Sequence, residues 1–455
     1  MEVTSTFLVL LAEFRCVFTT PTFATFARLM CGWVLSHRRR FVTELIWSSG
    51  STRRGHHSKY HRFFSKSVWE LDTLSWVLAK LLVEIFAPTG IIELAVDDTL
   101  CRKRGLSVYG TGMHHDPLIS SRAKPLVSWG HDWVVLTLIV RCPFWAPSKV
   151  WSLPIAFRLY RNRQGLTKGR KGRKKVKPRR RDPNHRTRPE LAVEMISLMS
   201  AWFPDRQLLV TGDSAYGGAS VLRKLPGNVD LISHVHPKGA LYESAPAKAP
   251  GQKGAPRKKG KRLPGMAAWA DDPSQPWRPL AFDQFGLHAT LLIKVQQALY
   301  YKAGKDRLLT IVLVRDAVGK RPDQMFYSTR LDWSARTILS KYAARWSIEV
   351  TFENSKQLLG LEDPANRVPA AVRRTAPMAL VLYSLIVAWF HKTGHKHVQF
   401  PDRPWYRHKH EPSFADMLTT LRRMSWEEHF RHLPITTRIV RKSLARITEF
   451  LALAG

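Results

Sequence analysis

The sequence predicts an α/β fold, with a mixed sheet flanked by helices, a β-rich insertion and helical regions at both ends. Apolar residues repeat with helical spacing through residues 1–90. From residue 91 short β-type runs alternate with helical segments, and further β-type runs lie between residues 289 and 330. The 455 residues, 44% of them hydrophobic, suffice for two or three domains with substantial cores.

Residues 1–90 are predicted to form a helical N-terminal region that binds DNA. A capping box of Ser67 and Glu70 is expected to start one of its helices. The segments "SHRRRF" (36–41) and "STRRGHHSKYHRFFSK" (51–66) mix basic and aromatic residues, which suits contact with phosphates and stacking on bases. A loop of solvated charges is the simpler alternative.

Residues 91–240 are predicted to form the first part of a central core. A basic arm (161–188), in which Asp182 is the only acid, interrupts it and cannot fold by itself. A helix beginning near Pro189 should follow the arm. The expected strands are "IIELAV", "WVVLTLIV", "WSLPIAFRLY", "RQLLVTGD" and "VDLISHVH".

Residues 241–334 are predicted to be the β-rich insertion, beginning with a basic, low-complexity linker. Its expected strands are "ATLLIKVQQALYY", "RLLTIVLVRD" and "QMFYSTR". Residues 335–395 should complete the core and include a long buried helix from about 370 to 392. Residues 396–455 are expected to be helical, with apolar stripes at Met417, Leu418 and Leu421 and at Leu444, Ile447 and Leu451.

The charge of the chain points to a polyanionic partner. Lys and Arg number 72 against 35 Asp and Glu, which gives a formal net charge of +37 and a pI near 10.6. Nucleic acid is the default partner of such a protein. A membrane-surface protein would instead concentrate its basic residues on one amphipathic helix, so no membrane partner is expected.

The four cysteines, Cys16, Cys31, Cys101 and Cys142, lack the spacing of a zinc site and suit a reducing cytoplasm. The N-terminal apolar run "FLVLLA" has no basic region before it and no cleavage site after it, so a signal peptide is not expected. The longest apolar run, 376–390, is too short to span a bilayer comfortably.

Three separated carboxylates suggest a metal site. Asp98 follows the first predicted strand and Asp213 ends another, and the ends of strands are where anchored carboxylates escape the core. Glu349 lies on a predicted helix, "YAARWSIEVTFENSK" (342–356), beside the apolar stripe of that helix. Divalent ions such as Mg²⁺ take oxygen ligands, and two of them can stabilise both the attacking and the leaving oxygen of a phosphoryl transfer.

The spacing of Tyr342, Arg345, Glu349 and Lys356 resembles the Tyr-Arg-Glu-Lys signature of one branch of bacterial insertion-sequence transposases, cut-and-paste enzymes of the DDE kind. "LAVDDT" (94–99) is similar to their first Asp motif and "LVTGDSAYGG" (209–218) to their second. "HHSKYHRFFSKSVW" (56–69) resembles the N-terminal region of related transposases. The resemblance covers roughly residues 55–390.

The resemblance implies a ribonuclease-H-like core in which the two Asp-bearing strands are neighbours. It also implies that Asp98, Asp213 and Glu349 bind two Mg²⁺ ions, for which Mn²⁺ is expected to substitute. Tyr342, Arg345 and Lys356 would hold phosphates of the transposon end. The charge density of the arm adds a second set of expected DNA contacts: Arg170, Lys171, Arg173, Lys174, Lys175, Arg179, Arg180 and Arg181.

Some assignments stay open at this point. Asp97 would point to the opposite face from Asp98, and Asp98 is favoured because Thr99 follows it, as in the family. Glu353 is a weaker alternative to Glu349. The family often places a Trp in the insertion to stack on a flipped base, and the candidates are Trp269, Trp277 and Trp333. His114, His115 and Asp116 could form a metal site, although a loop near the active site is the simpler interpretation.

The expected function is that of a DNA transposase that cuts at transposon ends and joins the freed 3′-hydroxyl to target DNA. Its partner is double-stranded DNA, and its location is the bacterial cytoplasm, with the nucleoid as its site when DNA is bound. The chain is expected to be a homodimer in the DNA complex, with part of the C-terminal region at the interface. The alternatives are a catalytically inactive, transposase-derived DNA-binding protein and a metal-dependent nuclease without strand transfer.

Overall fold

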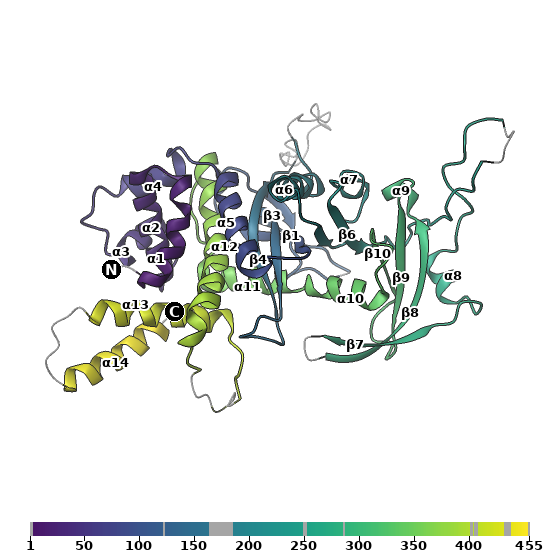
Figure 1. The fold of residues 1–455 in the computed structure, drawn as a ribbon. Helices are drawn as coiled ribbons and strands as arrows, with labels where there is room; N and C mark the ends of the chain where they lie inside the picture. Colours follow the sequence, from purple (N-terminus) through teal and green to yellow (C-terminus); the bar gives the residue numbers. More distant parts are fainter. Residues whose placement is uncertain are drawn as a thin grey trace.

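A mixed sheet of ten strands runs through the middle of the molecule (Figure 1). The computed structural model describes the chain apart from residues 1–2, 122, 163–184, 249–252, 285–286, 401–403, 405–407, 432–437 and 454–455. The N-terminal helices lie at one end of the sheet and the insertion lies at the other (Figure 1).

The first strands of the sheet have the arrangement of a ribonuclease-H-like core. Strands β1 (Ile92–Arg102), β3 (Val127–Arg141) and β4 (Val150–Tyr160) form an antiparallel meander, and β2 (Gly112–His115) pairs with the start of β3. Strands β5 (Leu208–Gly212) and β6 (Val229–His234) then run parallel to β1, in the order β4-β3-β1-β5-β6. The predicted fold class is therefore confirmed, and β1 and β5 are neighbours.

The insertion continues the same sheet. Its strands are β7 (Arg278–Gln284), β8 (Leu287–Leu299), β9 (Leu308–Asp316) and β10 (Gln324–Ser328), and β10 pairs antiparallel with β6. Strands β8, β9 and β10 were predicted, whereas β7 was missed. Strand β7 contains Pro279 and stands at the end of the strand order, where a missing backbone donor is tolerated.

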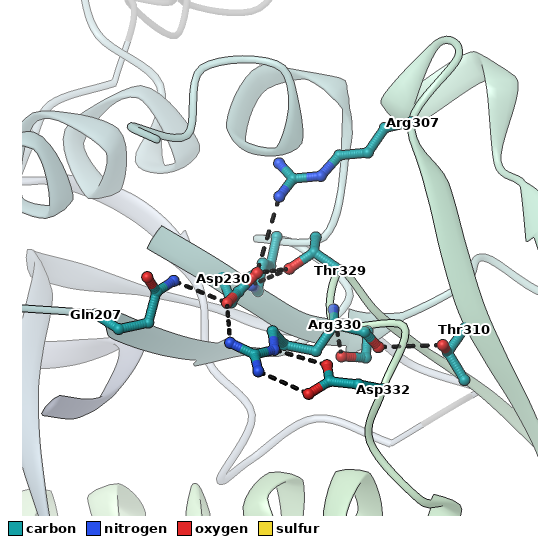
Figure 2. Close-up of polar contacts among 9 residues, drawn as sticks. Gln207, Asp230, Arg307, Thr310, Thr329, Arg330 and Asp332 are labelled. Carbon is teal, nitrogen blue, oxygen red and sulfur yellow. Dashed lines mark hydrogen bonds and ion pairs between the residues drawn. The ribbon is translucent and has the colours of Figure 1, made fainter. Parts of the chain in front are cut away.

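A polar cluster around Asp230 fastens the insertion to the core (Figure 2). The Asp230 carboxylate accepts hydrogen bonds from the Thr329 hydroxyl at 2.7 Å and from the Gln207 amide at 2.9 Å. Arg307 and Arg330 approach the same carboxylate at 3.9 and 3.7 Å. Asp230 and Gln207 belong to the core and the other partners to the insertion, so one carboxylate joins the two.

Helices cover both faces of the core sheet. Helices α5 (Leu71–Phe86) and α6 (Arg188–Trp202) lie on one face, where Arg158 of β4 pairs with a carboxylate from each. Helices α10 (Ala335–Ala344) and α11 (Ser347–Leu359) lie on the other face. The short helices are α7 (Ala219–Leu222), α8 (Met266–Ala270) and α9 (Tyr301–Gly304).

Helix α12 (Pro369–Lys392) lies between the sheet and the N-terminal helices (Figure 1). It is the one helix in the described part of the chain that is long and apolar enough to cross a membrane, yet 83% of its most apolar stretch is buried inside the protein. Pro369 stands in the first turn of the helix, and Pro377 lies within it. The helix is therefore the central core helix of the molecule.

The two ends of the chain pack on α12 and on each other. The N-terminal elements are α1 (Ser5–Ala12), η1 (Glu13–Val17), α2 (Thr20–Leu35), α3 (Val42–Ser48) and α4 (Ser58–Ser65). After η2 (Gly394–Lys396) come α13 (Phe414–Arg431) and α14 (Arg438–Leu453). The predicted stripe at Met417, Leu418 and Leu421 is buried in the chain's own core, so it is not an exposed dimer surface.

The expected capping box of Ser67 and Glu70 is wrong. Helix α5 has Glu70 as its N-cap, and no side chain caps it. Arg374 of α12 binds the backbone carbonyls of Ser67 and Trp69, at 2.8 and 2.5 Å, which holds this segment extended. A tertiary contact therefore replaces the local one that the sequence suggested.

Candidate active site

The candidate site lies where the parallel pairing of β1 and β5 ends. The last paired residues are Val96 and Gly212, so Asp97 and Asp213 directly follow this pair on the two strands. Strand β1 does not end there, as the sequence suggested. It continues to Arg102, paired with β3, so Asp97 and Asp98 both lie within it. Asp97 and Asp98 are thus anchored by backbone pairing with β3 on one side only, and Asp213 follows the end of β5.

Gly212 makes room for a tyrosine beside these acids. A Cβ at this position would stand 2.8 Å from Cβ of Tyr216 and 3.2 Å from a methyl of Val96. Tyr216 is completely buried, and its hydroxyl donates a 2.7 Å hydrogen bond to Oδ1 of Asp98. The "GDSAY" turn therefore places both Asp213 and a hydrogen-bond donor at the site.

Asp97 faces helix α11. Its carboxylate forms an ion pair with Arg345, and only 12% of its side chain is exposed. Burial raises the pKa of Asp97 to about 7, and the negative charges of Glu349, Asp213 and Asp98 add to the rise while Arg345 opposes it. The charges of all three acids predicted for the site therefore act on the carboxylate of Asp97.

Asp98 faces the opposite side of the sheet, as expected for the next residue of a strand. Its Oδ2 lies 3.4 Å from Nε of Arg188, the first residue of α6. The same guanidinium binds Asp132 of β3, a carboxylate that is 1% exposed. Burial raises the pKa of Asp98, against the effects of Arg188 and Tyr216. The structure thus favours Asp97, not Asp98, as the partner of the α11 carboxylate.

The predicted continuous helix from Tyr342 to Lys356 is interrupted. Helix α10 ends at Ala344 and α11 begins at Ser347. Four backbone hydrogen bonds in this turn span three residues instead of four, from the N–H groups of Arg345, Trp346, Ile348 and Glu349. Such a tight turn rotates the chain more per residue than an α-helix, so the four signature residues do not share one face.

Tyr342 is packed inward behind the site. Its ring contacts His234 and Phe326, with centroid distances of 4.8 Å in both cases. Burial, followed by the charge of Arg345, lowers the pKa of His234 to about 4, so this imidazole is neutral at physiological pH. Tyr342 consequently orients Arg345, whose guanidinium lies 5.5 Å from its ring centroid.

Glu349 and Lys356 stand on the outer part of α11. Glu349 is exposed and Lys356 is half-buried. Lys356 lies near β1, since its charge partly offsets the effect of burial, which raises the pKa of Cys101 to about 12. Glu353 is exposed and accepts a 3.1 Å hydrogen bond from Gln357, one turn farther from the aspartates than Glu349.

A comparison with models of known protein families identifies the family of the chain. Residues 13–298 match the model of a family described as the DDE superfamily endonuclease. The chain belongs to the DDE endonuclease superfamily. The match includes Asp97, Asp98 and Asp213 and ends before α11. No curated protein matches the chain.

One solved structure that resembles the chain is a synaptic complex of piggyBac transposase with hairpin DNA. The two share 12% sequence identity with a TM-score of 0.41, and the alignment covers 98% of this chain and 82% of the other.

The acids of this member of the DDE endonuclease superfamily fit a divalent cation by the chemistry of their donors, and enzymes of the superfamily generally use such ions. Carboxylate oxygens are the ligands that Mg²⁺ prefers, and the mutual repulsion acting on Asp97 is what a cation would relieve. As the described side chains stand, no three His, Cys, Asp or Glu residues are close enough together to hold an ion. Arg345 forms an ion pair with Asp97, and Arg188 lies beside Asp98.

Other sequence-based candidates lie away from this site or outside the described residues. The eight basic arm residues, from Arg170 to Arg181, lie outside them. Among the residues that the structure describes, His114, His115 and Asp116 do not form a metal site, because the Asp116 carboxylate binds Arg102 at 2.7 and 3.0 Å.

All three insertion tryptophans already contact other groups of the protein. Trp269 is 1% exposed and donates a hydrogen bond to Gln275. Trp277 has the cations of Lys294 and Arg315 over its ring. Trp333 likewise lies under two cationic side chains, those of Arg330 and Lys341.

Four residues of the site were not predicted from the sequence. Arg188 was counted with the arm, and Asp132 and Tyr216 drew no attention because their partners are distant in sequence. The fourth is Trp346, 65% exposed, between Arg345 and the helix that carries Glu349. The sequence does show this Trp between two charged residues of the signature, and that position could have identified it.

Proposed function

We propose that the protein is a DNA transposase that binds the terminal inverted repeats of its element, cuts DNA at the ends and joins the 3′-hydroxyl to target DNA. The observation that carries the proposal is the convergence of Asp97 and Asp213 at one edge of β1 and β5, with Arg345 and the Glu349 helix against them. This is the arrangement of acids and cations that phosphoryl transfer requires, in a chain of the DDE endonuclease superfamily.

Each residue has a role in this proposal. Asp97, Asp213 and Glu349 would hold two Mg²⁺ ions, with Mn²⁺ as a substitute, and Asp98 remains the alternative that the sequence favoured. When bound, such ions activate water and stabilise the leaving oxygen. Arg345 would exchange Asp97 for a phosphate oxygen, and Lys356 would hold a second phosphate. Tyr342 orients Arg345, and Trp346 is better placed than the insertion tryptophans to stack on a base.

The biological setting belongs to the same proposal. The Tyr-Arg-Glu-Lys spacing supports an origin in a bacterial insertion sequence and action in the cytoplasm, on the nucleoid. The basic arm, residues 161–188, would hold DNA without regard to sequence.

We also propose a homodimer in the DNA complex. Cutting both ends of an element requires two active sites, and inverted repeats share the two-fold symmetry of a dimer. Helix α14 exposes Ile447 and Phe450, at 47% and 70%, whereas the stripe of α13 is buried. The interface would therefore involve α14. Light scattering of protein mixed with end DNA tests this, and an active complex of one chain with one end would contradict it.

The decisive experiment uses DNA that carries the repeats flanking the gene of this protein. With Mg²⁺, the wild type should cut both strands at the repeat ends and join them to a second DNA. Cutting without joining would identify a nuclease. Binding with no cutting under any divalent ion would identify a catalytically inactive DNA-binding protein. Asp213→Asn serves as the control in which cutting is lost and binding is kept.

A further inference from the structure

A cavity of about 730 Å³ lies beyond the carboxyl end of β1, and Asp97, Asp98 and Asp213 do not line it. Three separate parts of the chain line it: the "SHRRRF" loop with Arg39 and Phe41, the residues after β1 with Arg104, and the loop after α11 with Arg367. Trp129 of β3 also lines it, as do the carboxylates of Glu362 and Asp363, which accept hydrogen bonds from the backbone N–H groups of Arg102 and Arg40. The cavity is thus rich in both arginine and aromatic side chains.

Three arginines of this cavity have no side-chain partner among the residues that the structure describes. Arg39, Arg104 and Arg367 are exposed, and the side chain of none of them forms an ion pair or hydrogen bond with another described residue. Elsewhere on the described surface many arginines are paired, as Arg158 is with Asp72 at 2.8 Å. Three unpaired guanidinium groups around one cavity make a strong site for an anion.

The walls of the cavity are held in place by buried neighbours of these arginines. Arg40, 8% exposed, turns away from the cavity and binds the carbonyl of Leu358 at the end of α11 at 2.7 Å. Lys103 binds the carbonyl of Glu362 at 2.6 Å and that of Pro364 at 3.0 Å. In both segments one basic residue fastens the backbone and its neighbour, Arg39 or Arg104, points its charge at the cavity.

The cavity continues from the candidate active site. Strand β1 leads from Asp98 to Arg102, and four residues of extended chain span about 13 Å. Lys356 of α11 lies along this path, close to Cys101 of β1. A series of cations therefore runs from Arg345 past Lys356 to the three unpaired arginines. In B-form DNA about 13 Å corresponds to roughly four base pairs.

We propose that this cavity binds the DNA strand on one side of the cut, with Arg39, Arg104 and Arg367 on its phosphates and Phe41 against a sugar or base. The inference rests on the proposed function and adds to it a place for the DNA roughly four base pairs from the scissile phosphate. Phe41 is 37% exposed, so its ring is available for such a contact. The "SHRRRF" loop thereby acts in DNA binding as part of the catalytic core.

The test compares two double variants of equal charge. Arg104→Ala/Arg367→Ala removes two cavity cations, and Lys320→Ala/Arg321→Ala removes two exposed cations from the turn between β9 and β10. Binding of a 30-base-pair duplex of arbitrary sequence is measured against salt concentration. The cavity variant should lower the slope of log K against log salt by about 1.8, because each lost phosphate contact removes about 0.9. The turn variant should leave the slope unchanged.

A second measurement tests the aromatic wall. Phe41→Ala should weaken binding of a 12-nucleotide oligothymidine about tenfold, as expected when a stacked base loses its partner. Trp47→Ala, on the next helix and 70% exposed, should not. Equal slopes for the two double variants, or equal losses for Phe41→Ala and Trp47→Ala, would overturn the proposal and leave the transposase function standing. Failure of the wild type to bind any DNA would overturn both.

Discussion

The two edges formed by the parallel strands β1, β5 and β6 surround buried carboxylates in opposite ways. At the amino edge, Asp230 is surrounded by donors: the Thr329 hydroxyl, the Gln207 amide and two arginines (Figure 2). At the carboxyl edge, Asp97 shares its surroundings with other acids and has one arginine. The first arrangement satisfies a charge and joins two parts of the fold. The second leaves charge in excess, which is what a binding site for cations and phosphates needs.

The largest effects should come from the carboxyl edge. Asp97→Asn, Asp213→Asn and Glu349→Gln should each lower Mg²⁺-dependent cleavage by about 10³-fold or more. The same changes should alter the free energy of unfolding by less than about 1 kcal/mol, because removing one of several mutually repelling charges offsets the lost contacts. Cleavage assays and urea unfolding measure the two quantities.

Asp98→Asn distinguishes the two candidates for the first acid. The geometry predicts that it retains more cleavage activity than Asp97→Asn, because Asp98 faces α6 and Arg188. Full loss in Asp98→Asn with normal cutting by Asp97→Asn would show that the choice made from the sequence was right.

The amino edge should behave in the reverse way. Asp230→Ala leaves Arg307 and Arg330 without their shared carboxylate and should lower the free energy of unfolding by about 2–3 kcal/mol. The matched control is Asp332→Ala, which also removes a partner of Arg330 but whose side chain is 61% exposed, and it should leave the free energy of unfolding nearly unchanged. Equal losses for the two variants would remove the contrast between the edges.

The basic arm should affect DNA affinity and leave the chemistry of bound DNA unchanged. Deleting residues 168–181 should weaken binding to every duplex and flatten its salt dependence, since phosphate contacts release counterions. The measurement is duplex affinity at several salt concentrations, with cleavage at saturating DNA as the control. An unchanged slope would mean that the arm does not contact DNA.

The smallest effect should come from removing the hydrogen bond that Tyr216 donates to Asp98. Tyr216→Phe removes the donor to Oδ1 of Asp98 and, since that bond lowers the pKa of Asp98, should raise this pKa further. Cleavage should fall less than tenfold, in line with about 1 kcal/mol for one hydrogen bond, and most clearly at low pH. Tyr327→Phe is the control, because its hydroxyl binds the backbone of Gly217 and should leave the pH profile unchanged.

Much of the fold follows from local patterns in the sequence. Alternating and β-branched runs predicted every strand of the core except β2, which has only four residues. The capping box of α6, Thr187 with Glu190, was hidden inside a basic run, whereas the one predicted at Ser67 was displaced by Arg374. Patterns fail where a distant side chain takes over a backbone group.

The site shows the same limit more sharply. Alternation along β1 made it plain that Asp97 and Asp98 point in opposite directions, but which direction leads to α11 depends on the packing of two helices on two faces. The break at Arg345 depends on four short-range backbone bonds that a regular helical wheel does not contain. The arginines beside these aspartates are distant in sequence. Arg188 is 90 residues from Asp98, and Arg345 is 248 residues from Asp97.

The meeting of the first and last helices has a consequence for how this chain folds as it is synthesised. The backbone N–H of Thr4 binds the hydroxyl of Ser425 across 421 residues, and the hydrophobic core extends from Val3 to Leu421. The indole N–H of Trp33 also donates a hydrogen bond to the carbonyl of Leu359, the last residue of α11. The N-terminal helices emerge from the ribosome first but cannot complete their core until nearly all of the residues described here have followed. Until then they expose apolar surface, which makes the unfinished chain prone to aggregation.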